Sequence, residues 1–444
     1  YLFGMEEPPK GELSLSMNNV KAAREGGRQS TPDMKLNGDH RNYITITVPE
    51  NVTIHNHTKG TAQTNGSMNV YGGDTFYLDA GLDVTGSYSS GNLYGSVGET
   101  WRTLVVSTGN ETQDIGVFES ESAAPVSFQV EWLKLARVEL TKKDSDTQNV
   151  LPGAVYGIYT DEQCRNLLME MPVTGTNGKA VSDYFDAALK TVYVSELIAP
   201  AGYVRDPEVY PVAVEAGKVS VAAVADDCVK GSIHINKIDR ETTRFLPQGD
   251  SVLAGAVYGL YAREDIVHPD GKTGVLHRKG SLIAQGAIKR DGTLDFTDLY
   301  LGKMFVKEIT PPEGYILDST EYETELTYEG QEKPVVTRSL TVQEQVKKRA
   351  FQLIKVSEDG DQTETELVAG AGFKVYLVSS LSKVKSGEKK PSKGTEFIAS
   401  DFRDYGFSRE QTAVTYENGK AVPVPELVTD SKGYAVSPEL PYGL

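Results

Sequence analysis

Several features that define common protein classes are scarce in this sequence. Cysteine accounts for only 2 of the 444 residues, which is too few for a disulfide framework. Lysine and arginine total 45 against 62 aspartate and glutamate residues, so the formal net charge is -17. Because an acidic surface repels phosphate groups, we expect no nucleic-acid partner. No apolar run is long enough to cross a bilayer, so we expect no membrane span in this segment.

The length and composition indicate a folded, multidomain chain. A chain of 444 residues has room for about three domains, each with its own hydrophobic core. The hydrophobic fraction of 39% and the charged fraction of 24% are ordinary for globular proteins and do not indicate disorder. The first residue is Tyr1 and no leader peptide follows it, so we expect that the natural start is missing.

A degenerate repeat runs through the last two thirds of the chain. The phrase Gly-Ala-Val-Tyr-Gly-Ile-Tyr at 153–159 returns as Gly-Ala-Val-Tyr-Gly-Leu-Tyr at 255–261, and a looser copy occupies 370–376. Each copy follows an alternating segment with a lysine near its end, namely Lys142, Lys237 or Lys355. Two copies precede a segment that ends in Glu196 or Glu308 and then a Pro-x-Gly-Tyr turn. Each repeat unit therefore spans about a hundred residues.

Short alternating segments separated by turn signals predict an all-β chain. We expect tandem β-sandwich domains with Greek-key connections. The predicted domains are an N-terminal β-rich domain at 1–134 and repeat domains at 135–229, 230–347 and 348–444. The third repeat lacks its glutamate segment, so we expect it to be C-terminally incomplete. Residues 21–42 are interpreted as a polar loop, and 262–284 and 379–430 as insertion loops.

The order of these motifs resembles the CnaB, or SpaA-type, prealbumin-like domain of Gram-positive surface proteins and pilins. The resemblance is strongest over 230–347, extends over 135–229, where Ser195 replaces a usual lysine, and is partial over 348–444. It implies an exported protein in the cell wall, with attachment to peptidoglycan through a missing C-terminal region. It also implies prealbumin-like or immunoglobulin-like sandwiches in a beads-on-a-string array, with a stalk or presenting role in an adhesin or pilus.

The resemblance further implies an intramolecular isopeptide bond. In this family a lysine of the first strand attacks the side-chain carbonyl of an asparagine or aspartate in the last strand, and a buried glutamate relays the proton. Burial penalises the charged forms of both the amine and the carboxyl group, which favours a nucleophilic amine and a protonated glutamate. Without the repeat, a strand lysine and a glutamate would be ordinary solvated residues.

The residues of the first repeat match this scheme more completely than those of the second and third. Lys142 and Glu196 match the lysine and glutamate, and Asp226, eleven residues before Lys237, matches the acceptor. The second repeat has Lys237 and Glu308, but Glu344 occupies the acceptor position and is flanked by Gln343 and Gln345, so no acceptor is found. The third repeat offers Lys355 alone.

Other candidate sites are weaker, and we predict neither a metal site nor a cofactor. His55 and His57 alternate on a predicted strand and could share a metal, but no third ligand lies nearby. Two acidic turns, at 144–146 and 359–361, lack the spacing of a calcium loop. The two cysteines, Cys164 and Cys228, are expected as unpaired thiols. The remaining candidate histidines, His234, His268 and His277, share no common spacing.

Three functions follow in order of preference. The first is a non-enzymatic structural segment of an extracellular adhesin or pilus-like protein. The second is direct binding of a host matrix protein or glycan through the first domain or the insertion loops. A sugar platform there would use these aromatic residues: Tyr71, Phe76, Tyr77, Tyr88, Tyr94 and Trp101. The third is a secreted glycan-active enzyme, although no nucleophile elbow, phosphate loop or zinc motif is present.

Overall fold

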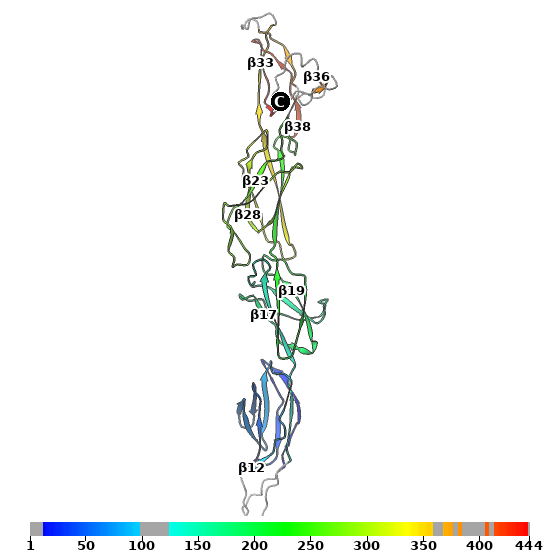
Figure 1. Ribbon diagram of the computed structural model, residues 1–444, viewed down its shortest axis with the longest axis vertical. Coiled ribbons are helices and arrows are strands. Elements are labelled where there is room, and N and C mark those ends of the chain that lie inside the picture. The colour runs from blue at the N-terminus through cyan, green and yellow to red at the C-terminus, as the bar shows by residue number, and fades with distance from the viewer. Residues whose placement is uncertain are drawn as a thin grey trace, which may run out of the picture. The chain divides into compact units, whose positions relative to one another are not determined.

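The computed structural model describes residues 12–97, 124–357, 367–375, 381–383, 405–407 and 413–442. These residues form β-strands and one short 3-10 helix, η2 (Ala187–Leu189), and contain no α-helix (Figure 1). None of the described helical segments is long and apolar enough to cross a membrane. The chain divides into two compact units, Tyr1–Pro200 with Arg205–Asp226 and Ala201–Val204 with Asp227–Leu444. The prediction of tandem all-β sandwich domains is confirmed.

The N-terminal part of the first unit contains thirteen named strands around one core. A seven-stranded sheet follows the order β1-β5-β10-β4-β3, with β7 beside β10 and β8 beside β7, and two three-stranded sheets follow the orders β11-β13-β2 and β12-β6-β9. Alternation places Ile44 and Ile46 of β6 in the core with Phe76 and Leu78 of β10. The strands are β1 (Ser14–Leu15), β2 (Asn19–Lys21), β3 (Ala23–Glu25), β4 (Arg28–Ser30), β5 (Met34–Asn37), β6 (Asn42–Thr47), β7 (Val52–Asn56), β8 (Thr61–Thr64), β9 (Ser67–Tyr71), β10 (Thr75–Gly81), β11 (Ser87–Ser89), β12 (Ser96–Val97) and β13 (Gln129–Glu131).

The prediction of a polar loop at 21–42 is wrong, because this segment contains β3, β4 and β5. Polar composition conceals β4. Gln29 is fully buried, and its side-chain amide donates to the carbonyl oxygens of Gly81 and Val84 and accepts from the backbone N–H of Leu133. The inward position of β4 is therefore occupied by a polar side chain whose hydrogen bonds are satisfied, rather than by the apolar side chain by which a strand is recognised in a sequence.

The first repeat domain, β14 to β21, packs two four-stranded sheets against each other. In one sheet β14 lies between β17 and β18 on one side and β21 on the other, and the second follows the order β16-β15-β19-β20. Every second side chain of β14 points inward, including Val138 and Leu140. The strands are β14 (Leu135–Asp144), β15 (Val155–Tyr159), β16 (Leu167–Glu170), β17 (Lys179–Val181), β18 (Phe185–Asp186), β19 (Thr191–Ile198), β20 (Val209–Ala213) and β21 (Val219–Asp226).

The second repeat domain, β22 to β31, has the same two sheets, ordered β27-β22-β31-β29 and β26-β23-β28-β30. The predicted insertion loop at 262–284 contains the hairpin of β24 and β25 and the start of β26. The strands are β22 (Lys230–Asp239), β23 (Val257–Ala262), β24 (Ile266–Val267), β25 (Val275–His277), β26 (Leu282–Ala287), β27 (Thr293–Leu299), β28 (Gly302–Thr310), β29 (Tyr315–Ile316), β30 (Tyr322–Leu326) and β31 (Val335–Val346).

The third repeat is described as strand pairs, β32-β41, β33-β40, β34-β39, β35-β36 and β37-β38. Its predicted insertion, 379–430, lies largely outside the described residues. The strands are β32 (Lys348–Arg349), β33 (Gln352–Ile354), β34 (Gly372–Phe373), β35 (Leu381–Lys383), β36 (Tyr405–Phe407), β37 (Val414–Glu417), β38 (Lys420–Pro423), β39 (Leu427–Val428), β40 (Tyr434–Val436) and β41 (Leu440–Pro441).

One turn contact recurs at the lysine of all three repeats. The backbone N–H of each lysine donates to the carbonyl oxygen of a hairpin glycine: Lys142 to Gly178 at 2.8 Å, Lys237 to Gly292 at 2.9 Å and Lys355 to Gly433 at 2.9 Å. All three glycines have a positive φ, between 70° and 87°. Because side chains rarely adopt this conformation, glycine lets the hairpin close against the lysine strand.

We predict that Gly178→Ala destabilises the first repeat domain by about 1–3 kcal/mol. Gly178 has a φ of +70°, and an added Cβ would lie 2.5 Å from the Val150 Cβ and 2.8 Å from the Lys142 carbonyl oxygen. Hydrogen exchange of residues 135–226 in the full chain measures the effect. The control is Gly27→Ala, where a Cβ meets nothing within 4 Å. Equal protection in the two variants would contradict the prediction.

Candidate functional site: two buried lysine and carboxyl clusters

The three residues predicted for the first repeat come together in its core. Alternation along β14 points Lys142 inward, and β21 runs parallel to β14 with Asp144 opposite Asp226. Glu196 of β19 lies opposite Tyr156 of β15 in the second sheet. Two facing sheets therefore supply one site, here called the Lys142 cluster, which consists of Lys142, Tyr156, Glu196 and Asp226.

The Lys142 cluster is fully enclosed. The side chains of Lys142, Glu196 and Asp226 have an exposed fraction of 0%. The Lys142 Nζ lies 3.0 Å from the Glu196 Oε1 and contacts the Asp226 Oδ1, and it donates a hydrogen bond of 2.7 Å to the Tyr156 hydroxyl. Buried lysine and glutamate side chains are rare unless they are paired, so the contact is a specific feature of this core.

Neighbouring groups orient the two carboxyl groups differently. The Glu196 Oε2 accepts a hydrogen bond of 2.8 Å from the backbone N–H of Asp206, which fixes one end of that side chain. The Asp226 Oδ2 is buried and has no hydrogen-bond partner among the described residues. One oxygen of Asp226 therefore faces the amine and the other makes no bond that would hold it.

The pKa of Asp226 is raised to about 7, chiefly by burial, while Lys142 opposes the shift and the Glu196 carboxyl adds to it. Burial likewise raises the pKa of the Tyr156 phenol, with Glu196 and Asp226 adding to the effect. At neutral pH the phenol keeps its proton, and Asp226 is poised to hold one. A protonated carboxyl beside an amine has the composition of an amide plus one water.

The second repeat contains the same constellation with a glutamate at the acceptor position. The Lys237 cluster consists of Lys237, Tyr258, Glu308 and Glu344. The Lys237 Nζ lies 3.3 Å from the Glu308 Oε1 and contacts the Glu344 Oε1, and it donates a hydrogen bond of 3.0 Å to the Tyr258 hydroxyl. The side chains of Lys237, Glu308 and Glu344 also have an exposed fraction of 0%.

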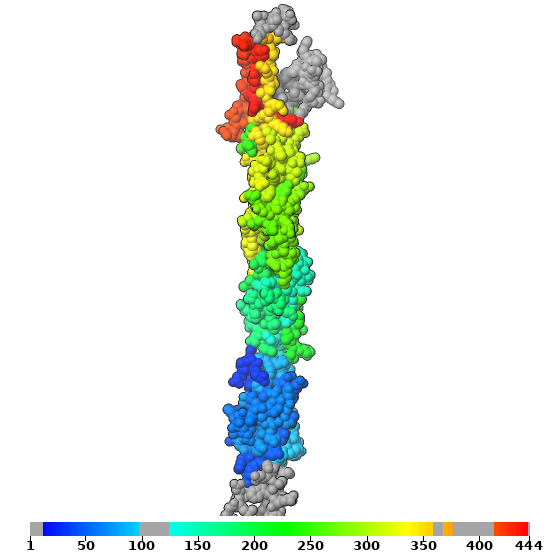
Figure 2. All heavy atoms as spheres, turned by 90° about the vertical axis from the view of Figure 1, so that its left-hand side faces the viewer, coloured from blue at the N-terminus to red at the C-terminus, as the bar shows by residue number. Residues whose placement is uncertain are grey.

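The register of the second cluster reproduces that of the first. Along the parallel strands β22 and β31, Asp239 lies opposite Glu344, as Asp144 lies opposite Asp226. The Glu308 Oε2 accepts a hydrogen bond of 2.9 Å from the backbone N–H of Asp318. The pKa of Glu344 is raised to about 8, chiefly by burial, with a hydrogen bond to Glu308 adding to the shift and Lys237 opposing it. On the face drawn in Figure 2, the atoms of this domain, coloured green to yellow, form a continuous surface.

The third repeat shows no such cluster in its described residues. Lys355 is exposed, although its backbone bond to Gly433 matches the other repeats. The predicted acidic turn at 359–361 lies outside the described residues.

The structure pairs each of the two candidate metal histidines, His55 and His57, with a different aspartate. The His55 Nε2 lies 3.1 Å from an Asp79 oxygen, while the His57 Nδ1 lies 3.1 Å from an Asp33 oxygen. Neither cysteine forms a disulfide, and the Cys228 Sγ lies 3.8 Å from the His268 Nε2. The other candidates lie as follows: His234 pairs with Asp295, His277 ends β25, Asp144 accepts from the backbone of its own turn, and Cys164 is half-buried.

The predicted aromatic platform is wrong for its central member. Phe76 is fully buried and packs against Phe128 in the core. Tyr77 stacks on His55, Tyr71 contacts Tyr43, and the Tyr88 hydroxyl donates to the Thr47 carbonyl oxygen. Tyr94 is exposed, and Trp101 lies outside the described residues.

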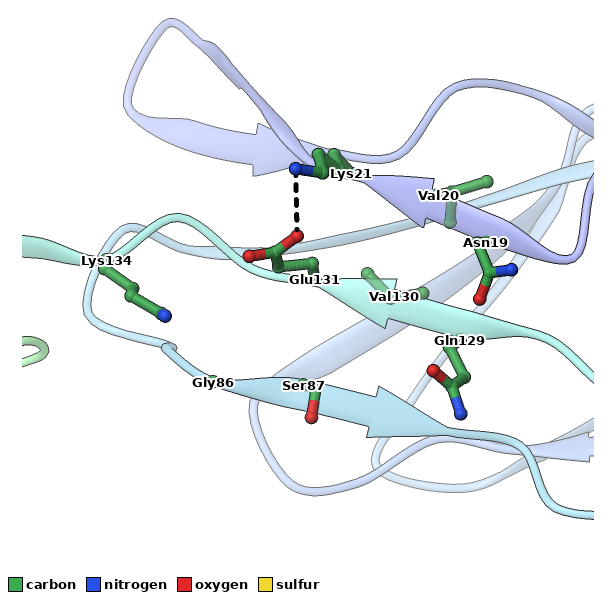
Figure 3. Close-up of a pocket in the computed structure, with 9 residues that line it drawn as sticks. All are labelled: Asn19, Val20, Lys21, Gly86, Ser87, Gln129, Val130, Glu131 and Lys134. Atoms are coloured by element: carbon green, nitrogen blue, oxygen red, sulfur yellow. Dashed lines mark ion pairs between the residues drawn. The ribbon is translucent and has the colours of Figure 1, made fainter.

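The N-terminal sheet formed by β2, β11 and β13 bears a surface hollow of about 400 Å³ (Figure 3). Its rim carries the polar side chains of Asn19, Ser87 and Gln129, and an ion pair of 3.2 Å joins Lys21 to Glu131. That pair is largely exposed, so it contributes little to stability.

Comparison with known protein families assigns domains of this chain to two families. A family model described as a prealbumin-like fold domain, SpaA, matches residues 136–227 and 231–339, and one described as a TED associated beta sandwich domain matches residues 14–97. Residues 136–227 and 231–339 are SpaA-type domains. The first matched range contains the whole Lys142 cluster, and the second contains Lys237, Tyr258 and Glu308, while Glu344 lies five residues beyond its end. No curated protein matches the chain.

Several solved structures resemble the chain at low identity. The TIE protein of Bacillus anthracis is 18% identical, with a TM-score of 0.47, over 97% of this chain and 67% of that one. A streptococcal ancillary pilin is 12% identical, with a TM-score of 0.23, over 76% of this chain and 99% of that one. The major pilin subunit of Bacillus cereus is 11% identical, with a TM-score of 0.18, over 48% of this chain and 100% of that one.

We predict that Lys142→Met makes the first SpaA-type domain less stable as the pH rises. Burial and Glu196 raise the pKa of Asp226, and the variant removes the opposing cation. The folded state of the variant then holds the Asp226 proton more tightly than the unfolded chain does. This proton therefore contributes its full stabilisation of the fold below pH 3.8, the ordinary pKa of an aspartate, and the contribution is lost as the pH rises toward and beyond 7. The free energy of unfolding falls by up to about 1.4 kcal/mol per pH unit.

Denaturant unfolding of the domain within the full chain, followed by hydrogen exchange from acid to neutral pH, tests this slope. Lys179→Met is the control, because Lys179 forms an exposed pair with Glu139 on the same sheet. A Lys142→Met stability that is flat or rises with pH would show that the Asp226 carboxyl is not held protonated.

Proposed function

We propose that this chain is a structural segment of a bacterial surface adhesin or pilus-like protein, and that its first SpaA-type domain is locked by an amide between Lys142 and Asp226. The observation that carries the proposal is the enclosed contact of the Lys142 Nζ with Asp226 beside Glu196. The SpaA-type fold of two consecutive domains supports the structural role.

The chemistry needs no group beyond the cluster. The Lys142 ammonium passes one proton to Glu196, and the neutral amine attacks the Cγ of the protonated Asp226 carboxyl. The C–N bond forms, and the carboxyl hydroxyl leaves with a second ammonium proton as water. The third proton stays on the amide nitrogen, and Glu196 ends protonated. The Tyr156 hydroxyl, which accepts from the Lys142 Nζ, keeps the amine aimed during the attack.

Such a bond would suit a stalk that bears force. Lys142 and Asp226 are 84 residues apart, so the amide closes most of the domain into one covalent loop. By the loop-entropy relation used for disulfides, a closure of this size stabilises the folded state by about 4–5 kcal/mol. An amide, unlike a disulfide, does not depend on the redox state of the surroundings.

Peptide mapping tests the proposed amide directly. After denaturation and trypsin digestion, we expect one peptide that joins the segments containing Lys142 and Asp226, with the mass of one water lost. Trypsin should also fail to cleave after Lys142, because the modified side chain carries no charge. Separate, unmodified peptides for the two segments would contradict the proposal.

We predict that Asp226→Ala destabilises the first SpaA-type domain by at least about 4 kcal/mol. The variant loses the covalent loop and leaves a buried lysine short of one partner. The matched control is Glu139→Ala on the neighbouring strand β14, which removes an exposed pair to Lys179 and should cost less than about 1 kcal/mol. Hydrogen exchange of residues 135–226 in the full chain compares the two, and equal losses would contradict the assignment.

The location and the partners of the chain rest on the family resemblance. We propose export to the cell surface and attachment to the wall, and the full reading frame of the gene tests this: an export signal and a wall-sorting signal are expected, and a frame with neither would contradict it.

Binding of a host matrix protein or glycan through the first domain or the insertions at 262–284 and 379–430 stays a prediction. Adhesion that survives deletion of both insertions and of residues 1–134 would assign the segment a spacer role alone.

A further inference from the structure

The second SpaA-type domain has no asparagine or aspartate at the acceptor position, yet its core places the carboxyl group of Glu344 against the lysine. We propose that Lys237 forms an intramolecular amide with Glu344, a glutamyl cross-link that makes Glu344 the acceptor of this domain. The inference extends to a second domain the chemistry proposed for Lys142, and it rests on a separate set of contacts.

The strand register brings the acceptor carboxyl to the amine. Lys237 lies opposite Val342 and Asp239 opposite Glu344, so Glu344 sits two residues beyond the lysine's own partner, on the inward face of β31. Asp226 has the same offset from Lys142. A glutamate is one methylene longer than an aspartate, and it still ends with its Oε1 in contact with the Lys237 Nζ.

Two further contacts orient Glu344 for attack. The Tyr258 hydroxyl lies 3.1 Å from the same Oε1 and donates to it, which polarises the carbonyl that the amine would attack. The Oε2 is buried and has no hydrogen-bond partner among the described residues. It is the oxygen that departs, because no contact holds it in place. Asp226 presents the same pair of one contacted and one unbonded oxygen.

Glu308 is the proton relay for this step. Its Oε1 lies 3.3 Å from the Lys237 Nζ, and its Oε2 is held by the backbone N–H of Asp318. The ammonium gives one proton to Glu308, and the neutral amine attacks the Cδ of the protonated Glu344 carboxyl. The C–N bond forms, and the Glu344 hydroxyl leaves with a second proton as water. The nitrogen keeps the third proton, so atoms and charge balance without a co-reactant.

The cross-link would enclose a larger part of its domain than the one in the first domain. Lys237 and Glu344 are 107 residues apart, against 84 for Lys142 and Asp226. It would join β22 and β31, which are the first and last strands of this domain along the chain and lie side by side in parallel in the sheet.

The experiment compares intact masses of the full chain and two variants after denaturation. Glu344→Gln presents an amide that loses ammonia where glutamate loses water, so the cross-linked product is the same molecule. We therefore expect Glu344→Gln and the unsubstituted chain to have identical mature masses. The control is Glu325→Gln, an exposed residue of β30, which should be lighter by the difference between a hydroxyl and an amino group.

Each outcome decides the inference. A Glu344→Gln mass that is lower by the same difference as the control shows that Glu344 is not consumed, and overturns the proposal. If Glu344→Gln does not fold, a tryptic map of the unsubstituted chain decides: a peptide joining Lys237 to Glu344 supports the amide, and two separate peptides overturn it. The Lys142 and Asp226 peptides in the same digest report independently on the first domain.

Discussion

The burial of a lysine amine between two carboxyl groups is the constraint around which each SpaA-type domain is organised. An ammonium group and two carboxylates cannot be enclosed in an apolar core at low cost unless they pair and share protons. The two sheets meet this demand together, since the lysine and the acceptor come from neighbouring parallel strands and the glutamate comes from the facing sheet. An amide would remove the charges altogether, and with them the electrostatic cost.

The two domains act as internal controls for each other. The tyrosine that accepts from the amine, the glutamate whose far oxygen is held by a backbone N–H, and the glycine that closes the hairpin on the lysine occur in both. The acceptor differs, as Asp226 in one and Glu344 in the other, while its register does not. A shared framework with one altered side chain indicates that the strand geometry, rather than the length of the acceptor, brings the groups into contact.

The fold class could be predicted from the sequence because strands alternate with a period of two and a phrase recurs along the chain. The members of the first cluster, Lys142, Glu196 and Asp226, were implied by the resemblance to the CnaB family. The sequence could not predict that Tyr156 and Tyr258 contact the amines, because an aromatic residue on a buried strand has the same pattern whether or not its hydroxyl is used. Glu344 was found at the acceptor position but set aside on residue type, since spacing alone does not report contact. The strand containing Gln29 was missed because a buried amide satisfied by backbone groups has the composition of a loop.

The central claim is that buried lysines in this chain become amides, and the intact mass of the denatured full chain tests it most directly. The account predicts a mass lower than the sum of the sequence by two waters, one for each SpaA-type domain. A mass equal to that sum would contradict it, and would leave both clusters as buried ion pairs held by packing alone.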